Sequence, residues 1–223
     1  MTSREAEKRA GKIVSYSGKE RCDLVYALGT LTHTTHKSVL YIDNSIFHDL
    51  YAVFAGNNDT DEVLDFGDVV VAKDRKIPER DMRKFDLCIL YSGLNTDQSV
   101  FYQKADEYII APGEEAEEVA RMKKAADEIR KIWSVDAFTL IQRDKTGRKQ
   151  TLGTIAEKIG VRPKRSYVLK FSEENYSAYT ALTINKNGGL RGISEEMKLL
   201  AVELITIYLN ESEKRIRSFL KKM

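Results

Sequence analysis

The chain has 223 residues, of which 42% are hydrophobic and 31% charged, as is usual for a soluble globular protein. This length suits one α/β domain with a substantial core. The 36 basic and 34 acidic residues nearly cancel, which excludes a protein that binds nucleic acid through a global basic field but leaves a local patch open. No apolar run approaches the roughly 20 residues that span a bilayer, and the polar start lacks the apolar core of a secretory signal, so we expect a cytoplasmic protein.

Short segments rich in β-branched and aromatic residues predict seven strands, several of them apolar throughout, as in strands covered on both faces. They span residues 12–16, 38–43, 69–72, 85–91, 107–111, 137–142 and 167–169. Helical spacing of apolar residues predicts helices over 23–32, 114–133, 152–159, 176–183 and 194–219. The alternation predicts a single doubly wound, mainly parallel α/β sheet with helices on both faces. Ligands of such sheets bind at the carboxyl ends of the strands, where we expect the loops after residues 17, 43 and 91 to gather.

The first predicted strand runs into a short turn, Ser17-Gly18-Lys19, and then into the first helix. Strand, glycine turn and helix are the order of elements in a phosphate-binding loop. A working loop also needs further glycines, a lysine for the β- and γ-phosphates and a Ser/Thr hydroxyl for Mg²⁺. In those places the chain has four other residues, Glu20, Arg21, Cys22 and Asp23. The frame indicates a nucleotide-binding ancestor, and the chemistry indicates that hydrolysis is lost.

The two cysteines fit a reducing compartment without a disulfide framework. Cys88 lies in an apolar run and is expected to pack in the core. Cys22 lies in the short loop, and we expect it to be exposed. The three histidines, His33, His36 and His48, have no Cys or acidic cluster to complete a metal site, so we interpret them as loop residues.

In their succession, six segments resemble the ParA/MinD family of deviant Walker-type ATPases, including its CpaE/TadZ-like branch, over roughly residues 12–210. They are SGK with ALG (17–19 and 27–29), VLYID (39–43), FDLCILYS (85–92), ADEYIIAPGE (105–114), LIQR (140–143) and a closing helix (194–204). The resemblance implies a P-loop NTPase-like fold of the SIMIBI class. It also implies Mg-ATP as the ligand if the loop still binds one, and no other cofactor.

The departures from the family pattern fall on the residues that carry the chemistry. If the gap in the loop precedes Arg21, then Arg21, Cys22 and Asp23 take the places of the Walker lysine and threonines; otherwise that lysine and threonine are absent. Asp23 would repel a phosphate, and a thiol is a poor ligand for Mg²⁺. Tyr91 stands where the family has the acid on the metal side.

Two family residues are retained: Lys19 matches the signature lysine that reaches the partner's nucleotide in a dimer, and Asp43 matches the acid near the attacking water. We therefore predict a vestigial nucleotide or anion site, with no catalytic residue and no metal ligands, formed by Ser17, Gly18, Lys19, Arg21, Cys22, Asp43, Tyr91 and Gln142. Phosphoryl transfer depends on positioning and charge neutralisation, so these losses predict a pseudo-ATPase. An ordinary turn with incidental charges stays open as the alternative for Gly18, Lys19 and Asp43.

As a function, the resemblance implies a positioning or scaffold protein of a pilus, division or segregation system, with protein partners and a homodimer. One alternative is a functional ATPase with an atypical loop that uses Lys19 or Arg21 on phosphate. A second is a DNA-associated partition or mobile-element accessory protein, which would use a basic set made of Lys145, Arg148, Lys149, Arg162, Lys164 and Arg165.

The sequence divides into a polar lead (1–11), the ParA/MinD-like domain (12–210) and a basic amphipathic tail (211–223). In the tail, the apolar residues recur at helical spacing: Ile216, Phe219, Leu220 and Met223. The tail is similar to the membrane-targeting helix of MinD, which implies peripheral contact with the inner face of the membrane. The alternative is one long helix whose last turns pack on the domain or on a partner.

Overall fold

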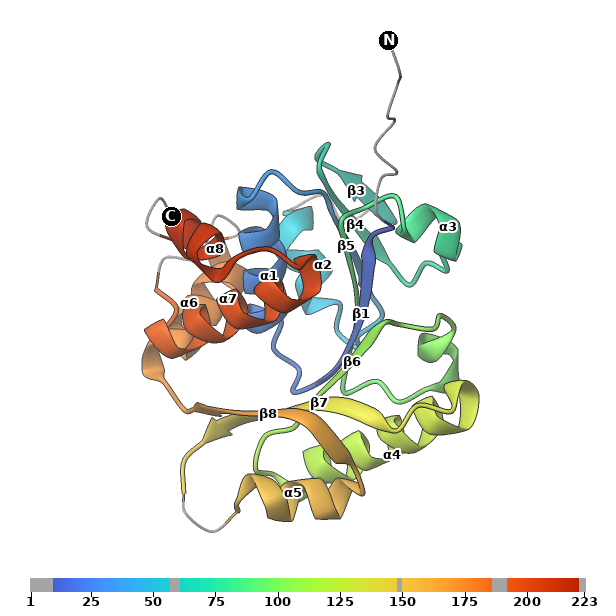
Figure 1. Ribbon diagram of the computed structural model, residues 1–223, viewed down its shortest axis with the longest axis vertical. Helices are drawn as coiled ribbons and strands as arrows, with labels where there is room; N and C mark the ends of the chain where they lie inside the picture. The colour runs from blue at the N-terminus through green and yellow to red at the C-terminus, as the bar shows by residue number, and fades with distance from the viewer. Residues whose placement is uncertain (1–9, 57–60, 148–149, 186–191, 221–223) are drawn as a thin grey trace.

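The computed structural model describes residues 10–56, 61–147, 150–185 and 192–220. Within these residues one eight-stranded sheet runs through the molecule, with the strand order β3-β4-β2-β5-β1-β6-β7-β8 (Figure 1). Every neighbouring pair is parallel except β3 and β4. The predicted doubly wound, mainly parallel sheet is confirmed. The strands are β1 (Lys12–Gly18), β2 (Val39–Asp43), β3 (Val63–Asp65), β4 (Val69–Lys73), β5 (Leu87–Gly93), β6 (Glu107–Ala111), β7 (Ala137–Lys145) and β8 (Arg162–Lys170).

Helices cover both faces of the sheet and enclose two apolar cores (Figure 1). One face carries α1 (Asp23–Thr34), α2 (Asp49–Ala55), α6 (Glu173–Asn185), α7 (Glu195–Leu209) and α8 (Glu213–Leu220). The other face carries α3 (Glu79–Met82), the 3₁₀ helix η1 (Gln98–Phe101), α4 (Ala116–Trp133) and α5 (Leu152–Ile159). Because both faces are covered, every residue of the central strands β2 and β5 is buried, as their unbroken apolar runs predict.

Glycine sets the distance between α1 and the sheet. A Cβ atom at Gly29 would lie 1.8 Å from the hydroxyl of Tyr41 on β2, so a larger residue would push α1 off the sheet. This contact fixes the helix that follows the turn at residues 18–22, and with it the start of the candidate site.

Several segments differ from the elements expected from sequence. The strand β3, the helices α2 and α3 and the 3₁₀ helix η1 were not predicted, because each is too short to show a period. The strand β8 begins at Arg162, five residues before the strand expected over 167–169. The helix predicted over 194–219 is wrong as one element: it ends at Leu209, and α8 begins at Glu213. Asn210 takes a left-handed conformation (φ 52°), which ends α7. The Ser212 carbonyl then accepts hydrogen bonds from the amides of Arg215 and Ile216 in the first turn of α8.

Candidate functional site

The loops after β1, β2 and β5 meet at the carboxyl edge of the sheet, as predicted. The hydroxyls of Ser17 and Ser92 lie 2.8 Å apart, and the Asn44 amide donates to the Tyr91 carbonyl at 2.7 Å. The turn itself is fixed to β6, because the Lys19 amide donates to the Ala111 carbonyl at 2.9 Å. A Cβ atom at Gly18 would lie 2.5 Å from that same carbonyl oxygen, so only glycine fits there.

The start of α1 is bound by a carboxylate of the chain itself. The amide of Cys22, the residue that precedes α1, donates to Oδ2 of Asp49 at 2.9 Å. Asp23, the first helical residue, accepts the Leu24 amide at 2.9 Å. Negative charge is favourable at a helix N-terminus, where the free amides and the helix dipole also attract phosphate. At this helix the charge comes from aspartates rather than from a ligand.

Cys22 corrects one prediction from sequence. Its side chain is fully buried in the core shared with α1, not exposed in the loop. Burial, and next the neighbouring Asp49, raise the pKa of the Cys22 thiol well above its ordinary value. The thiol is therefore a packed side chain rather than a reactive group. Cys88 is also buried, as predicted.

Three basic and three acidic side chains form one continuous ion-pair chain beneath the turn. Arg143 holds Asp23 through Nη2, at 2.7 and 2.9 Å from its two carboxylate oxygens. Arg21 joins Asp23 (2.5 Å) to Asp144 (2.9 Å). Lys19 lies 3.2 Å from Asp144 and 3.7 Å from Glu118. The charges cancel within this set, which we call the ion-pair chain.

The ion-pair chain is deeply buried at its inner end. The side chains of Arg143 and Asp23 are 1% and 0% exposed, and that of Arg21 is 6% exposed. Ions so far from water persist only where partners and hydrogen bonds satisfy them. Arg21 also lies against two aromatic rings of α6, at 5.8 Å from the centre of Tyr176 and 5.5 Å from that of Tyr179. Arg21 is thus enclosed by the protein and does not face a ligand.

An irregularity in β7 brings Arg143 and Asp144 to this place. The register between β7 and β8 shifts between Gln142 and Lys145, and Asp144 has a left-handed backbone (φ 51°). The Arg143 amide extends the pairing of β7 with β6, because it donates to the carbonyl of Pro112, the residue after β6, at 2.7 Å. Bulges of this kind redirect side chains near functional edges of sheets. Sequence reasoning missed Arg143, Asp144 and Glu118 as site residues, because their contacts with the turn are long-range; the LIQR match ended one residue short of the aspartate.

Asp43 is the most enclosed acid of the site. Its Oδ1 accepts the amide (2.9 Å) and hydroxyl (2.6 Å) of Ser45, and its Oδ2 accepts the Tyr51 amide at 2.8 Å. His48 stands beside it, with Nδ1 at 3.9 Å from Asp43 and Nε2 at 3.0 Å from Asp74. The nearby carboxylate of Asp43 raises the pKa of His48, although burial opposes this. Asp43 therefore organises the loop after β2.

Glu20 links the turn to the loops after β2 and β5. Its carboxylate accepts the Leu94 amide at 2.7 Å and the Ile46 amide at 3.1 Å. Burial raises the pKa of Glu20, while the bond from Leu94 acts in the opposite direction. Sequence reasoning marked Glu20 only as a residue out of place in a phosphate loop.

The last two predicted site residues are buried at the same edge of the sheet. Tyr91 is fully buried on β5 and packs against Tyr16 on β1, with ring centres 5.8 Å apart. Gln142 is buried on β7, where its Nε2 donates to the Gln150 carbonyl at 3.3 Å. Tyr91, which the resemblance in sequence aligns with the metal-side acid, thus has a buried phenol, and Gln142 has a buried amide on β7.

These residues do not fit Mg-ATP in the manner of a phosphate loop. Lys19 and Arg21 are bound to acids of the chain, and the Cys22 amide is bound to Asp49. A buried thiol and a buried phenol stand in the places of the hard oxygen ligands that Mg²⁺ requires. Asp43 and Asp49 are two further buried carboxylates at this edge of the sheet, and Asp49 binds the Cys22 amide at the start of α1.

The predicted tail forms α8, whose apolar residues pack on the domain. Ile216 is fully buried in the core with α1 and α7, and Leu220 packs partly against the same core. The Phe219 ring meets the His36 ring edge-on at 6.1 Å. Met223 lies outside the described residues. Within the described chain, no helix is long and apolar enough to cross a membrane. Membrane contact through this face stays a prediction and requires α8 to leave the domain.

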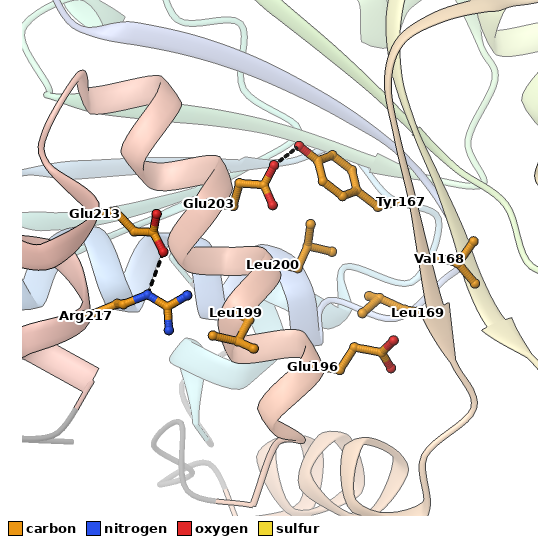
Figure 2. A pocket seen from close by; sticks show the side chains of 9 residues that line it. All are labelled: Tyr167, Val168, Leu169, Glu196, Leu199, Leu200, Glu203, Glu213 and Arg217. Atoms are coloured by element: carbon orange, nitrogen blue, oxygen red, sulfur yellow. Dashed lines mark hydrogen bonds and ion pairs between the residues drawn. The ribbon is translucent and has the colours of Figure 1, made fainter.

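A hollow of about 390 Å³ lies between β8, α7 and α8, away from the site (Figure 2). Leu199 and Leu200 of α7 lie near Leu169 of β8, and the Tyr167 hydroxyl donates to Glu203 at 2.7 Å across it. On the other side, Arg217 of α8 is paired with Glu213 at 2.6 Å.

Those basic residues predicted to contact DNA that the structure describes lie at opposite ends of β7 and β8. Lys145 pairs in register with Lys170, at the carboxyl end of β8, whereas Arg162 begins β8 beside Ala137. Eight residues of β7 separate the two ends, a distance of about 26 Å. Near the start of β8, Glu107 takes up the charge of Lys164 (2.5 Å) and Arg165 (3.6 Å). Arg148 and Lys149 lie outside the described residues.

Comparison with known proteins gives matches in structure alone. The sequence matches no protein-family model and no curated protein. A ParA family ATPase from Chlorobium tepidum has a similar structure, with 14% identity and a TM-score of 0.62 over 88% of this chain and 98% of its own. MinD from Aquifex aeolicus, in a complex with MinC, gives 10% identity and a TM-score of 0.67 over 91% and 97%.

A putative plasmid partition protein from Borrelia burgdorferi, bound to AMPPNP, matches with 15% identity and a TM-score of 0.59 over 96% of this chain and all of its own. The three matches extend over 88–96% of this chain, so the likeness concerns the domain rather than a fragment. At these identities the likeness concerns the fold. The chain therefore has the fold of the ParA/MinD-type ATPases, a P-loop NTPase architecture.

Proposed function

We propose that this chain is a non-hydrolysing protein with the ParA/MinD fold, which serves as a positioning or scaffold protein in a pilus, division or segregation system. One observation carries the proposal: the groups that would bind a nucleotide's phosphates are bound by acids of the chain. Asp49 takes the amide at the start of α1, and the ion-pair chain takes Lys19 and Arg21.

Electrostatics supports the loss of nucleotide binding. An incoming triphosphate would have to displace Asp49 from the Cys22 amide and separate Arg21 from Asp144. It would then leave buried carboxylates unpaired beside its own charges. Breaking one partner out of a buried ion pair costs about 3–5 kcal/mol, and like charges add to that. Phosphoryl transfer has no other source of charge neutralisation among these residues.

The fold supports work through protein partners. The MinD of similar structure is seen in a complex with MinC. In our proposal this chain acts in the cytoplasm in the same general way, through other proteins of its machine and a second copy of itself. If two copies meet at the carboxyl edge of the sheet, their interface has no nucleotide in it and is held by contacts between protein side chains.

Thermal unfolding in Mg-ATP tests the proposal. A ligand that binds only the folded state stabilises it, by roughly 2.7 kcal/mol at a concentration of a hundred times Kd, and so raises the melting temperature. We expect no rise with millimolar Mg-ATP or Mg-ADP. Inorganic triphosphate at equal ionic strength is the control for a general effect of anions. A rise seen with Mg-ATP and absent with triphosphate would support an ATP-binding protein and would contradict the proposal.

A further inference from the structure

The side chain of Glu20 lies between two loops that follow neighbouring strands. Its Oε2 accepts the Leu94 amide at 2.7 Å, just after β5, and its Oε1 accepts the Ile46 amide at 3.1 Å, after β2. Each carboxylate oxygen is thus engaged by a different loop. One anion at the end of β1 connects three segments at the carboxyl edge of the sheet.

Gly93 makes room for this carboxylate. A Cβ atom at Gly93 would lie 2.5 Å from Oε2 of Glu20, and the residue has φ +53°, a conformation that disfavours side chains. The backbone of β5 therefore ends in a form that both admits the carboxylate and aims the next amide at it.

Main-chain amides that converge from loops form sites for oxyanions. In nucleotide-dependent switches a terminal phosphate orders two such loops, and they relax when the phosphate leaves. A carboxylate has the same charge sign and the same hydrogen-bonding capacity toward two amides. Because Glu20 belongs to the chain, it is neither hydrolysed nor released.

We propose that Glu20 is an internal anion that occupies an oxyanion site formed by the amides of Ile46 and Leu94 and holds both loops in one arrangement without nucleotide. This inference rests on the proposed function, in which no nucleotide is present to order these loops. The two loops then keep one ordered arrangement, instead of switching between two arrangements as a ligand binds and leaves.

The held loop carries exposed apolar side chains. Ile46 is 48% exposed and Phe47 is 75% exposed, directly after the turn that Asp43 and Glu20 fix. Their positions follow from the backbone that Glu20 binds. The chain thus presents these two side chains in a fixed place at all times.

A second contact joins the same loops without an anion and supplies a matched control. The side-chain amide of Asn95 donates to the Asn44 carbonyl at 2.9 Å. Asn95→Ala removes this bond between the loops, together with the bond that its Oδ1 accepts from the Asp97 amide at 3.0 Å, and leaves no pair of amides from two loops without an acceptor. Glu20→Ala removes a tie and leaves two amides facing a vacant oxyanion site.

Hydrogen exchange followed by mass spectrometry on the full chain tests the proposal. In Glu20→Ala we expect exchange in residues 44–48 and 93–97 to accelerate together by about tenfold or more, since hydrogen bonds to charged groups are lost. Added acetate or inorganic phosphate should slow exchange again in Glu20→Ala. Neither anion should slow exchange in Asn95→Ala. Exchange in α4 reports on the fold and should stay unchanged.

Two results would overturn the inference: unchanged exchange in both loops of Glu20→Ala, or equal responses of the two variants to the anions. If Glu20→Ala does not fold, Glu20→Gln gives the answer, because its single amide oxygen can keep one bond and should loosen one loop more than the other. The outcome is separate from that of the proposed function. Stabilisation of the unaltered chain by Mg-ATP would contradict the function, whatever the loops of Glu20→Ala do.

Discussion

Buried charges of the chain itself pair with one another beneath the turn between β1 and α1. Asp23 is 0% exposed and is held by Arg143 and Arg21, so its charge is balanced on both sides. Such pairs contribute little net stability, but loss of one partner costs about 3–5 kcal/mol, because the other charge stays buried. The ion-pair chain therefore resists substitution at each of its inner positions, and a ligand that separates the charges meets the same cost.

Asp49 gives a prediction that depends on pH. Burial, and next the nearby carboxylate of Asp43, raise the pKa of Asp49. A carboxyl whose pKa is higher in the folded than in the unfolded state adds stability below the unfolded pKa of about 3.9, and this contribution is lost as the pH rises through the folded pKa. Above its folded pKa, a charged Asp49 is therefore less favourable to the folded state than a neutral side chain of the same shape.

Asp49→Asn should remove this buried charge, while the amide oxygen of the new side chain still accepts the Cys22 amide. We expect the melting temperature at pH 7 to rise by roughly 2–4 °C, which ~1 kcal/mol produces in a chain of this size. The gain should shrink toward zero as the pH approaches the unfolded value. Asp136→Asn, at a side chain 94% exposed, is the control and should change little. A loss of stability in Asp49→Asn at pH 7 would show that the charge itself is required.

For single residues, the sequence predicts where a side chain lies along the chain but not which distant side chains it contacts. The gathering of the loops after residues 17, 43 and 91 follows from the order of strands alone, and it is confirmed. The burial of Cys22 depends on the core that α1 joins, and the roles of Arg143, Asp144 and Glu118 depend on contacts more than 90 residues apart along the chain. No spacing in the sequence encodes those contacts.

Among the elements, α8 departs furthest from expectation. The period of apolar residues runs on from α7 into α8, which made one helix the natural prediction. The break comes from two residues, Asn210 in a left-handed conformation and Ser212 at the start of α8. Asn and Ser are common at helix ends, but both also occur within helices, so the pattern alone does not fix the break. The break turns α8 back onto α1 and α7.

The docking of α8 predicts an unequal effect of two neighbouring substitutions. Ile216→Ala removes a fully buried side chain and should lower the free energy of unfolding by about 2–5 kcal/mol. Arg217→Ala removes an exposed charge that pairs with Glu213 and should change it by about 0.5 kcal/mol or less. Urea unfolding of the two variants measures both. Equal, small effects would mean that α8 is free in solution and available to a membrane.

For the molecule as a whole, the fold and the chemistry of the site depend on different residues. Fold depends on the many apolar residues of β2, β5 and the facing helices, which the sequence shows as runs and periods. Nucleotide chemistry depends on a few groups in one turn, which can be lost without loss of the fold. The ParA/MinD fold could therefore be predicted from the order of segments, whereas the filling of its site by Glu20, Asp49 and the ion-pair chain required the structure.

The most direct test of the central claim is titration calorimetry of the unaltered chain with Mg-ATP. Because Asp49, Glu20 and the ion-pair chain already engage the groups at the turn, we predict no saturable heat of binding at ligand concentrations up to the millimolar range. Saturable binding with one nucleotide per chain and a micromolar Kd would contradict the account.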